Sequence, residues 1–240
     1  MHRKINIIWC FVFLFMSSFV VSQHSITLVS EVELDIKEPS GIAFHEGDLY
    51  VVGDSEPFLY QLSLGGLIKD RYEVAVKDME GVVYHPKFKS FVLLSETNRQ
   101  MVRFSIENGI QEKFDLKGKQ SKSNMGLEGI CYHSDLKSLF VVNEAHPKRM
   151  MQVTNKGKVK KKFDLKFPSD ISGITYDKEL NVFWIVSDES KALYKVSEKG
   201  EEIQKFLLDI EKAEGIAIDD KRRLYIVSDR TNNLFVYQIK

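Results

Sequence analysis

Short runs of apolar and β-branched residues, separated by polar turns, recur from residue 25 to the end of the chain. One set of runs follows a Ser-Gly or Glu-Gly pair, and its members are IAF, VVY, ICY, ITY and IAI. A second set follows the next polar turn, and its members are LYVV, FVLL, LFVV, FWIV and LYIV. Runs of this composition bounded by turn residues predict β-strands. No segment keeps a helical period over about eleven residues, so the pattern predicts an all-β fold.

The whole pattern repeats five times. The repeats begin at EPSG, DMEG, GLEG, DISG and KAEG, and their shared glycines are Gly41, Gly81, Gly129, Gly173 and Gly215. The glycines are 40 to 48 residues apart, and a more polar fourth run such as KVKKKFDLK completes each of the first four repeats. A period of about 40–50 residues with four strands is typical of a propeller blade. The sequence therefore predicts a five-bladed β-propeller.

The two ends of the repeat region complement each other. The fifth repeat stops after its third strand, at Lys240, while an unassigned strand, Ser25–Asp35, precedes the first repeat. We expect this N-terminal strand to close the propeller as the fourth strand of the last blade, because closure removes free sheet edges. The propeller domain would then span residues 23–240. A solenoid is the alternative, but it needs capping repeats, and none is found.

The first 22 residues have a different composition. The basic MHRK precedes the apolar run INIIWCFVFLFM, and small residues follow up to Ser22. This order predicts a secretory signal peptide over residues 1–22 and an extracytoplasmic location. The apolar stretch Ile5–Val21 is near the short limit for a spanning helix, so an uncleaved N-terminal membrane anchor is the alternative. Loss of Cys10 with the signal would leave Cys131, which we expect to be a buried, unreactive thiol.

Acidic residues recur at two positions of the repeat. In a propeller, the first strand of each blade lies beside the central channel. The residue before the glycine and the residue after the second strand then share one face, which we call the top face. The residues before the glycines are Ser40, Glu80, Glu128, Ser172 and Glu214. The residues after the second strands are Asp54, Glu96, Glu144, Asp188 and Asp229. We expect these carboxylates to converge on one mouth of the channel.

Converging carboxylates raise one another's pKa and favour a bound cation. Carboxylate, hydroxyl and carbonyl oxygens are hard ligands that suit Ca²⁺ better than Zn²⁺ or copper. The predicted metal ligands are Glu80, Glu128, Glu214, Glu144 and Asp188. The alternative is that the acids are solvated loop residues, since Arg99, Lys148, Lys191 and Arg230 follow closely behind them and exposed ion pairs contribute only about 0–1 kcal/mol.

Three histidines suggest a different metal site. They lie four residues after the glycine in consecutive repeats and are His45, His85 and His133. Three histidines can ligate Zn²⁺. The equivalent residues of the last two repeats are Asp177 and Asp219, so we interpret the position as one that opens a turn on the bottom face, away from the glutamates. His146, beside Glu144 in a top loop, is the better candidate for a functional histidine.

The N-terminal segment, the five Glu/Ser-Gly-Ile/Val repeats and the loops SDE, SET and NEA together resemble the SdiA-regulated family of bacterial envelope proteins. The resemblance covers residues 25–240, and NHL-type propellers also carry blade-repeated glycines. It implies a five-bladed propeller with a calcium site, associated with the periplasm or the plasma membrane. A more distant likeness is to six-bladed calcium-dependent lactonases and gluconolactonases, which also place a Glu before a glycine. Here there are five repeats, and the asparagine and aspartate of their ligand set have no match.

Three functions stay open at this point. The first is a calcium-binding propeller of the cell envelope that acts as a binding or scaffold module, with an unknown protein or small molecule on its top face. The second is a calcium-dependent hydrolase of lactones, esters or phosphoesters, with Glu144, Asp188 or His146 as general base. It has no Gly-x-Ser-x-Gly or His-Glu-x-x-His motif to support it. The third is a structural envelope protein with solvated acids.

Two further features narrow the choice. The chain has 34 basic and 34 acidic residues, so its bulk charge indicates no nucleic-acid partner. The longest gap between glycines holds the insertion KGKQSKSN, Lys117–Asn124, which could face a substrate or partner. Its composition favours a flexible surface loop.

Overall fold

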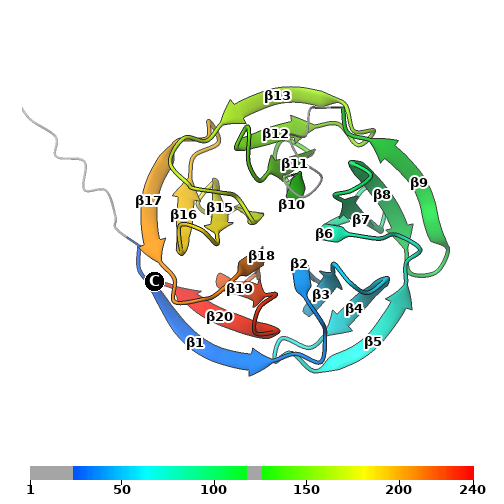
Figure 1. Ribbon diagram of the computed structural model, residues 1–240, viewed down its shortest axis with the longest axis horizontal. Helices are drawn as coiled ribbons and strands as arrows, with labels where there is room; N and C mark the ends of the chain where they lie inside the picture. The colour runs from blue at the N-terminus through cyan, green and yellow to red at the C-terminus, as the bar shows by residue number, and fades with distance from the viewer. Residues whose placement is uncertain (1–23, 118–125) are drawn as a thin grey trace, which may run out of the picture.

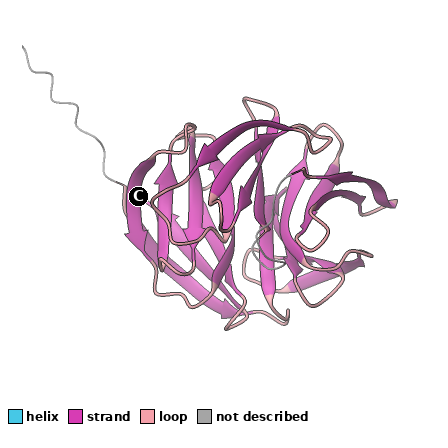
Figure 2. Cartoon of the chain, turned by 45° about the horizontal axis from the view of Figure 1, so that its top comes forward, coloured by secondary structure: helices cyan, strands magenta, loops and turns pink. Residues whose placement is uncertain are grey.

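The five predicted repeats fold into five antiparallel sheets arranged around a central channel (Figure 1). The computed structural model describes residues 24–117 and 126–240, and these residues form strands and loops without a helix (Figure 2). The predicted signal peptide or anchor at residues 1–22 and nearly all of the predicted loop at 117–124 lie outside the described residues. Within the described part of the chain, no helix is long and apolar enough to cross a membrane.

Each repeat forms one blade, and we number the blades 1 to 5 in chain order. Blade 1 holds β2 (Pro39–His45), β3 (Asp48–Gly53), β4 (Phe58–Leu62) and β5 (Ile68–Glu73). Blade 2 holds β6 (Met79–His85), β7 (Ser90–Ser95), β8 (Gln100–Ser105) and β9 (Gly109–Asp115). Blade 3 holds β10 (Leu127–His133), β11 (Ser138–Asn143), β12 (Arg149–Val153) and β13 (Val159–Asp164). Blade 4 holds β14 (Gly173–Asp177), β15 (Val182–Ser187), β16 (Ala192–Val196) and β17 (Glu202–Leu207).

Blade 5 is built from both ends of the chain. It holds β18 (Ala213–Ile218), β19 (Arg223–Ser228), β20 (Asn233–Ile239) and β1 (Ile26–Glu33). The N-terminal strand β1 pairs antiparallel with β20 and lies at the outer edge of the sheet (Figure 1). The prediction of a five-bladed propeller closed by an N-terminal strand is therefore confirmed.

The core consists of five apolar clusters, one between each pair of adjacent blades. The first three strands of each blade are mostly buried, whereas the outermost strands are mostly exposed, because only their inner sides meet a neighbouring blade. Trp184, which is fully buried between blades 4 and 5, also donates a hydrogen bond from Nε1 to Asp177 at 3.2 Å. Cys131 is buried between blades 3 and 4, and this burial raises the pKa of its thiol, as expected for an unreactive cysteine.

Candidate metal centre at the channel mouth

The repeated Glu-Gly and Ser-Gly pairs have a geometric cause. The glycines of the first strands pack against one another around the channel, so that a Cβ on Gly215 would lie 2.7 Å from the carbonyl oxygen of Ser40. The strand pairing shifts register at the residue before the glycine in blades 1, 2, 3 and 5. A bulge leaves one residue outside the ladder and redirects its side chain. The glycine allows the close approach of the strands, and the bulge places the preceding side chain at the channel mouth.

We call the top opening of the channel the acidic mouth. It encloses a cavity of about 220 Å³ lined by 11 carboxylates, one lysine and two serines. All five predicted metal ligands line it, namely Glu80, Glu128, Glu214, Glu144 and Asp188. The other predicted acids and serines line it as well: Ser40, Asp54, Glu96, Ser172 and Asp229. His146 is exposed and does not line this cavity.

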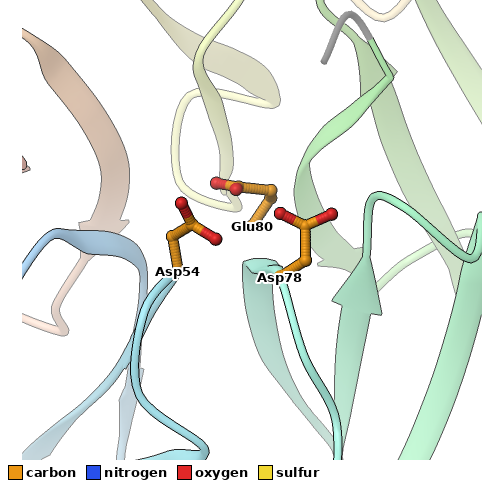
Figure 3. A group of neighbouring side chains, drawn as sticks. All are labelled: Asp54, Asp78 and Glu80. Atoms are coloured by element: carbon orange, nitrogen blue, oxygen red, sulfur yellow. The ribbon is translucent and has the colours of Figure 1, made fainter. Parts of the chain in front are cut away.

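One part of the acidic mouth brings three carboxylates close together. The ligand oxygens of Asp54, Asp78 and Glu80 lie within 4.8 Å of one another (Figure 3). Among the His, Cys, Asp and Glu side chains of the described residues, these three carboxylates could together hold one metal ion. Asp78 is oriented by Thr97, whose backbone N–H and hydroxyl both donate to its Oδ2 atom. Asp54 and Asp78 come from loops of adjacent blades, so this trio joins blades 1 and 2.

The carboxylates are poorly solvated and repel one another. Burial, followed by the charges of neighbouring acids, raises the pKa of Glu80 and Glu128 well above the ordinary value. Burial likewise raises the pKa of Glu96 and of Glu144 to about 7. Burial and a hydrogen bond with Asp78 raise the pKa of Asp54 to about 6. The acidic mouth therefore favours either protons or a bound cation, and a hard divalent cation suits its all-oxygen donor set.

The described part of the chain compensates the buried carboxylates of the acidic mouth only in part, as two of them show. Glu128 is only 9% exposed, and the charges of Glu80 and Glu214 act on its buried carboxylate. The Oε2 atom of Glu144 is buried and has no hydrogen-bond partner among residues 24–117 and 126–240. Glu96, by contrast, accepts a 2.6 Å hydrogen bond from the backbone N–H of Gly126. Buried acceptors without donors are costly, so a cation would stabilise these groups.

The proposed basic neighbours do not neutralise the acids. Among the ion pairs of residues 24–117 and 126–240, none joins Glu96 to Arg99 or Glu144 to Lys148. The base that reaches the mouth is Lys212, whose Nζ lies 3.9 Å from Glu214. One lysine cannot balance this number of carboxylates, so most of the charge stays unpaired within the described chain.

Sequence reasoning missed one position of the repeat. The residue two places before the serine or glutamate also lines the mouth, and its members are Glu38, Asp78, Asp170 and Lys212. Asp170 is 5% exposed and accepts hydrogen bonds from the Ser187 hydroxyl and the Glu189 backbone N–H. The aligned repeat starts EPSG, DMEG, DISG and KAEG carry this charge periodicity.

We call the bottom opening of the channel the aromatic mouth. The residues three places after the glycines surround it, and they are Phe44, Tyr84, Tyr132, Tyr176 and Ile218. Its cavity measures about 350 Å³. Between the two mouths, glycines and aliphatic side chains narrow the channel to a cavity of about 10 Å³, near the size of one water. The two mouths are therefore separate compartments.

The three repeated histidines pack against the aromatic rings of the aromatic mouth. His45 stacks on Tyr84 of the next blade with ring centroids 3.4 Å apart, and His133 stacks on Tyr176 at 3.8 Å. His85 packs against Tyr132 at 4.9 Å. The histidines face three different blade interfaces and form no metal-binding group within the described chain. In blade 4, Asp177 accepts hydrogen bonds from the backbone N–H groups of the following turn, as expected for a residue that opens a turn.

Two kinds of comparison place this geometry among known proteins. Residues 17–240 match the family model described as SdiA-regulated. Among solved structures, the chain is similar to glutaminyl cyclase from Myxococcus xanthus at 15% identity and a TM-score of 0.71, with 90% of this chain and 96% of that chain covered.

Two further structures share the fold at lower similarity. A gluconolactonase from Xanthomonas campestris, XC5397, is 10% identical with a TM-score of 0.58, and the match covers 89% of this chain and 99% of that chain. Virginiamycin B lyase from Staphylococcus aureus is 12% identical with a TM-score of 0.56, and the match covers 90% and 99%. At these identities the likeness shows the propeller fold alone.

Proposed function

The chain belongs to the SdiA-regulated family, and we propose that it is a calcium-binding propeller of the bacterial cell envelope that acts as a binding or scaffold module. One observation carries the proposal: the carboxylates of several blades converge on the acidic mouth with one lysine among them. Such a mouth is electrostatically unfavourable when every carboxylate is ionised. A divalent cation would remove that penalty, and a rigid ring of loops around it would offer a recognition surface.

The donor set supports calcium over other metals. Ca²⁺ takes six to eight oxygen ligands at flexible geometry, and carboxylates can supply one or two each. Asp54, Asp78 and Glu80 would provide the closest group of oxygens. The predicted ligands Glu128, Glu214, Glu144 and Asp188 line the same cavity and would complete or balance the site. The described residues that line the mouth include no cysteine and no histidine, which makes a soft-metal site unfavourable.

The proposed cell-envelope location is argued from the N-terminal sequence, and the proposed partner from the top face. The basic, apolar and small-residue order of residues 1–22 supports export, with a cleaved signal peptide or a retained membrane anchor. The partner would be a protein or a small molecule that binds the top face, where the loops of all five blades meet.

A calcium-dependent hydrolase is the second candidate. It is supported by Glu144, which lines the acidic mouth and whose pKa is raised by burial to about 7, a value suited to a general base beside a cation. A bound cation would supply Lewis-acid polarisation of an ester, lactone or phosphoester. The gluconolactonase from Xanthomonas campestris shares only the fold with this chain. The hydrolase proposal therefore depends on Glu144 and not on that likeness.

Thermal unfolding in EDTA and across a Ca²⁺ titration tests the proposal. Binding to the folded state adds RT ln(1 + [L]/Kd), so Ca²⁺ at about 100 times Kd should raise the melting temperature by about 5–10 °C. The Glu80/Glu128/Glu214→Gln triple variant should lose this rise. Hydrolysis of lactones and phosphoesters by the calcium-loaded protein, lost in Glu144→Gln, would select the enzyme over the binding module.

A matched control removes three charges elsewhere. Glu73, Glu107 and Glu202 are exposed and lie away from the mouth, so their triple substitution by Gln should keep the calcium response. The proposal would be wrong if the wild-type protein melted at the same temperature in EDTA and in saturating Ca²⁺.

A further inference from the structure

A second charged cavity lies between blades 2 and 3, and its charge is opposite to that of the acidic mouth. Its volume is about 410 Å³. Four of its lining side chains are basic and none is acidic, and the bases are Arg99, Lys117, Arg149 and Lys162. They come from the turn before β8, the second residue after β9, and strands β12 and β13 of the neighbouring blade (Figure 1). We call this cavity the basic pocket.

The basic pocket adjoins the acidic mouth through shared loops. The backbone N–H of Arg99 donates to the carbonyl of Glu96 at 2.9 Å, which closes a tight turn. Glu96 lines the mouth, whereas Arg99 lines the basic pocket. In blade 3, Glu144 lines the mouth, whereas the preceding residue, Asn143, lines the pocket. The turn after β7 and the end of β11 thus each present an acid to the channel and a hydrogen-bonding side chain to the pocket.

Arg99 has unused donors in this pocket. A guanidinium carries five N–H donors, and the Nη1 atom of Arg99 makes one hydrogen bond of 3.3 Å to Asn143 Oδ1. Its Nε atom is buried and has no partner within the described chain. The Nη2 atom of Arg99 makes no hydrogen bond within the described chain, so its N–H groups can donate to an acceptor brought by a ligand.

The charge of the pocket is only partly balanced by the protein. Arg149 is paired through Nε with the exposed Asp164 at 2.5 Å, which leaves its terminal nitrogens available. Glu96 lies near Arg99 but already accepts from Gly126. Lys117 and Lys162 form no ion pair within residues 24–117 and 126–240.

We propose that the basic pocket binds a small soluble ligand through an oxyanion group, either phosphate, sulfate or carboxylate. The two guanidinium groups suit the paired oxygens of such groups. The lysine ammonium groups add positive charge with little dependence on the orientation of the ligand. The pocket is larger than a bare ion and falls in the size range of ligand sites, so the rest of the ligand would lie against Pro147 and Met151. The inference does not rest on the calcium site, because no residue lines both cavities.

Calorimetric titration of the full chain with inorganic phosphate, inorganic sulfate, acetate and glucose 6-phosphate tests the inference at constant ionic strength in chloride. We expect saturable binding of at least one oxyanion, weakened about tenfold or more by Arg99→Gln, because the substitution removes the charge and most of the fork. Tighter binding of glucose 6-phosphate than of phosphate would show that the rest of the pocket contributes. Equal binding would assign recognition to the oxyanion alone.

Three further variants guard against misfolding and nonspecific effects. Arg149→Gln and Lys162→Gln change side chains at the solvent-facing side of the pocket and should also weaken binding. Arg71→Gln removes a guanidinium that lies over Phe58 in blade 1 and should leave binding unchanged. The inference is overturned if no oxyanion binds the wild-type protein, or if the three pocket variants, Arg99→Gln, Arg149→Gln and Lys162→Gln, all bind as the wild type does.

Discussion

The two mouths of the channel are built from the same repeat and have opposite chemistry. At the top, the positions around each glycine carry acids whose charge the protein leaves largely unpaired. At the bottom, most residues three places after the glycine are aromatic, and the histidines that follow in blades 1 to 3 pack on the aromatic ring of the next blade. The side chains of the bottom mouth pack against one another across blade interfaces, whereas the carboxylates of the top mouth repel one another. We infer from this comparison that the bottom stabilises the ring of blades, and we propose that the top binds a cation.

The largest expected effect is a loss of stability from a substitution that pushes apart the first strands of blades 5 and 1, on which both mouths depend. In Gly215→Ala, the new Cβ would meet only backbone atoms: Ser40 O at 2.7 Å, Ile42 N at 2.8 Å and Gly41 Cα at 3.0 Å. Because these atoms cannot move aside without opening the blade 5–blade 1 contact, we expect a loss of about 2–4 kcal/mol in the free energy of unfolding. Urea unfolding measures this change.

Gly65→Ala is the matched control for that substitution. A Cβ on Gly65 would meet only Ser63 Oγ at 3.9 Å, so the change should stay within about 0.5 kcal/mol. Equal costs for the two alanines would contradict the close packing of glycines around the channel.

A smaller effect is the pH dependence of the free energy of unfolding, which should have opposite signs for the acids of the top mouth and the histidines of the bottom mouth. At the top, burial raises the folded-state pKa of Glu96 and Glu144 from 4.5 to about 7, so the folded protein binds more protons than the unfolded chain in that window. The stability of the metal-free protein should therefore fall as pH rises from about 4.5 to 7. Glu96→Gln/Glu144→Gln should flatten this fall, as measured by urea unfolding in EDTA at several pH values.

The bottom mouth should act in the opposite direction. Burial lowers the pKa of His45 and His85 below 6.5, so the unfolded chain binds the protons first as pH falls. Their contribution to stability is complete above about pH 6.5 and is lost at lower pH. His45→Gln/His85→Gln should remove this acid-side loss. A change of the same sign in the two double variants would break the comparison.

The smallest expected effect is the coupling across one stacked pair. His45 and Tyr84 stack with an interplanar angle of 14°. A double-mutant cycle of His45→Ala and Tyr84→Ala should give a coupling free energy of about 0.5–1.5 kcal/mol. The calcium response of all three variants should match the wild type, since the narrow neck separates the two mouths. Purely additive costs would show that the stack contributes nothing beyond burial.

The fold was predictable from the sequence because its determinants are local and periodic. Alternating apolar runs, turn residues and a glycine every 40 to 48 residues are sufficient to define five blades. Once the blades are known, topology alone brings Glu80, Glu128 and Glu214 to one mouth. The same argument placed His45 and its equivalents on the opposite face.

Other parts of the site depend on contacts that periodicity does not report. Asp78 lies before its strand, and its direction is set by Thr97 in a loop 19 residues away. The stack of His45 on Tyr84 arises only when adjacent blades pack. The basic pocket combines Arg99 and Arg149 from different positions of two repeats, so no repeat alignment brings them together.

Calorimetric titration of Ca²⁺ into metal-free protein tests the central claim most directly. The account predicts saturable calcium binding by the wild type, with an affinity at least about tenfold weaker in Asp54→Asn/Asp78→Asn/Glu80→Gln and unchanged in Tyr84→Ala. Absence of calcium binding by the wild type, or equal affinity in the triple variant, would contradict the assignment of the acidic mouth as the cation site.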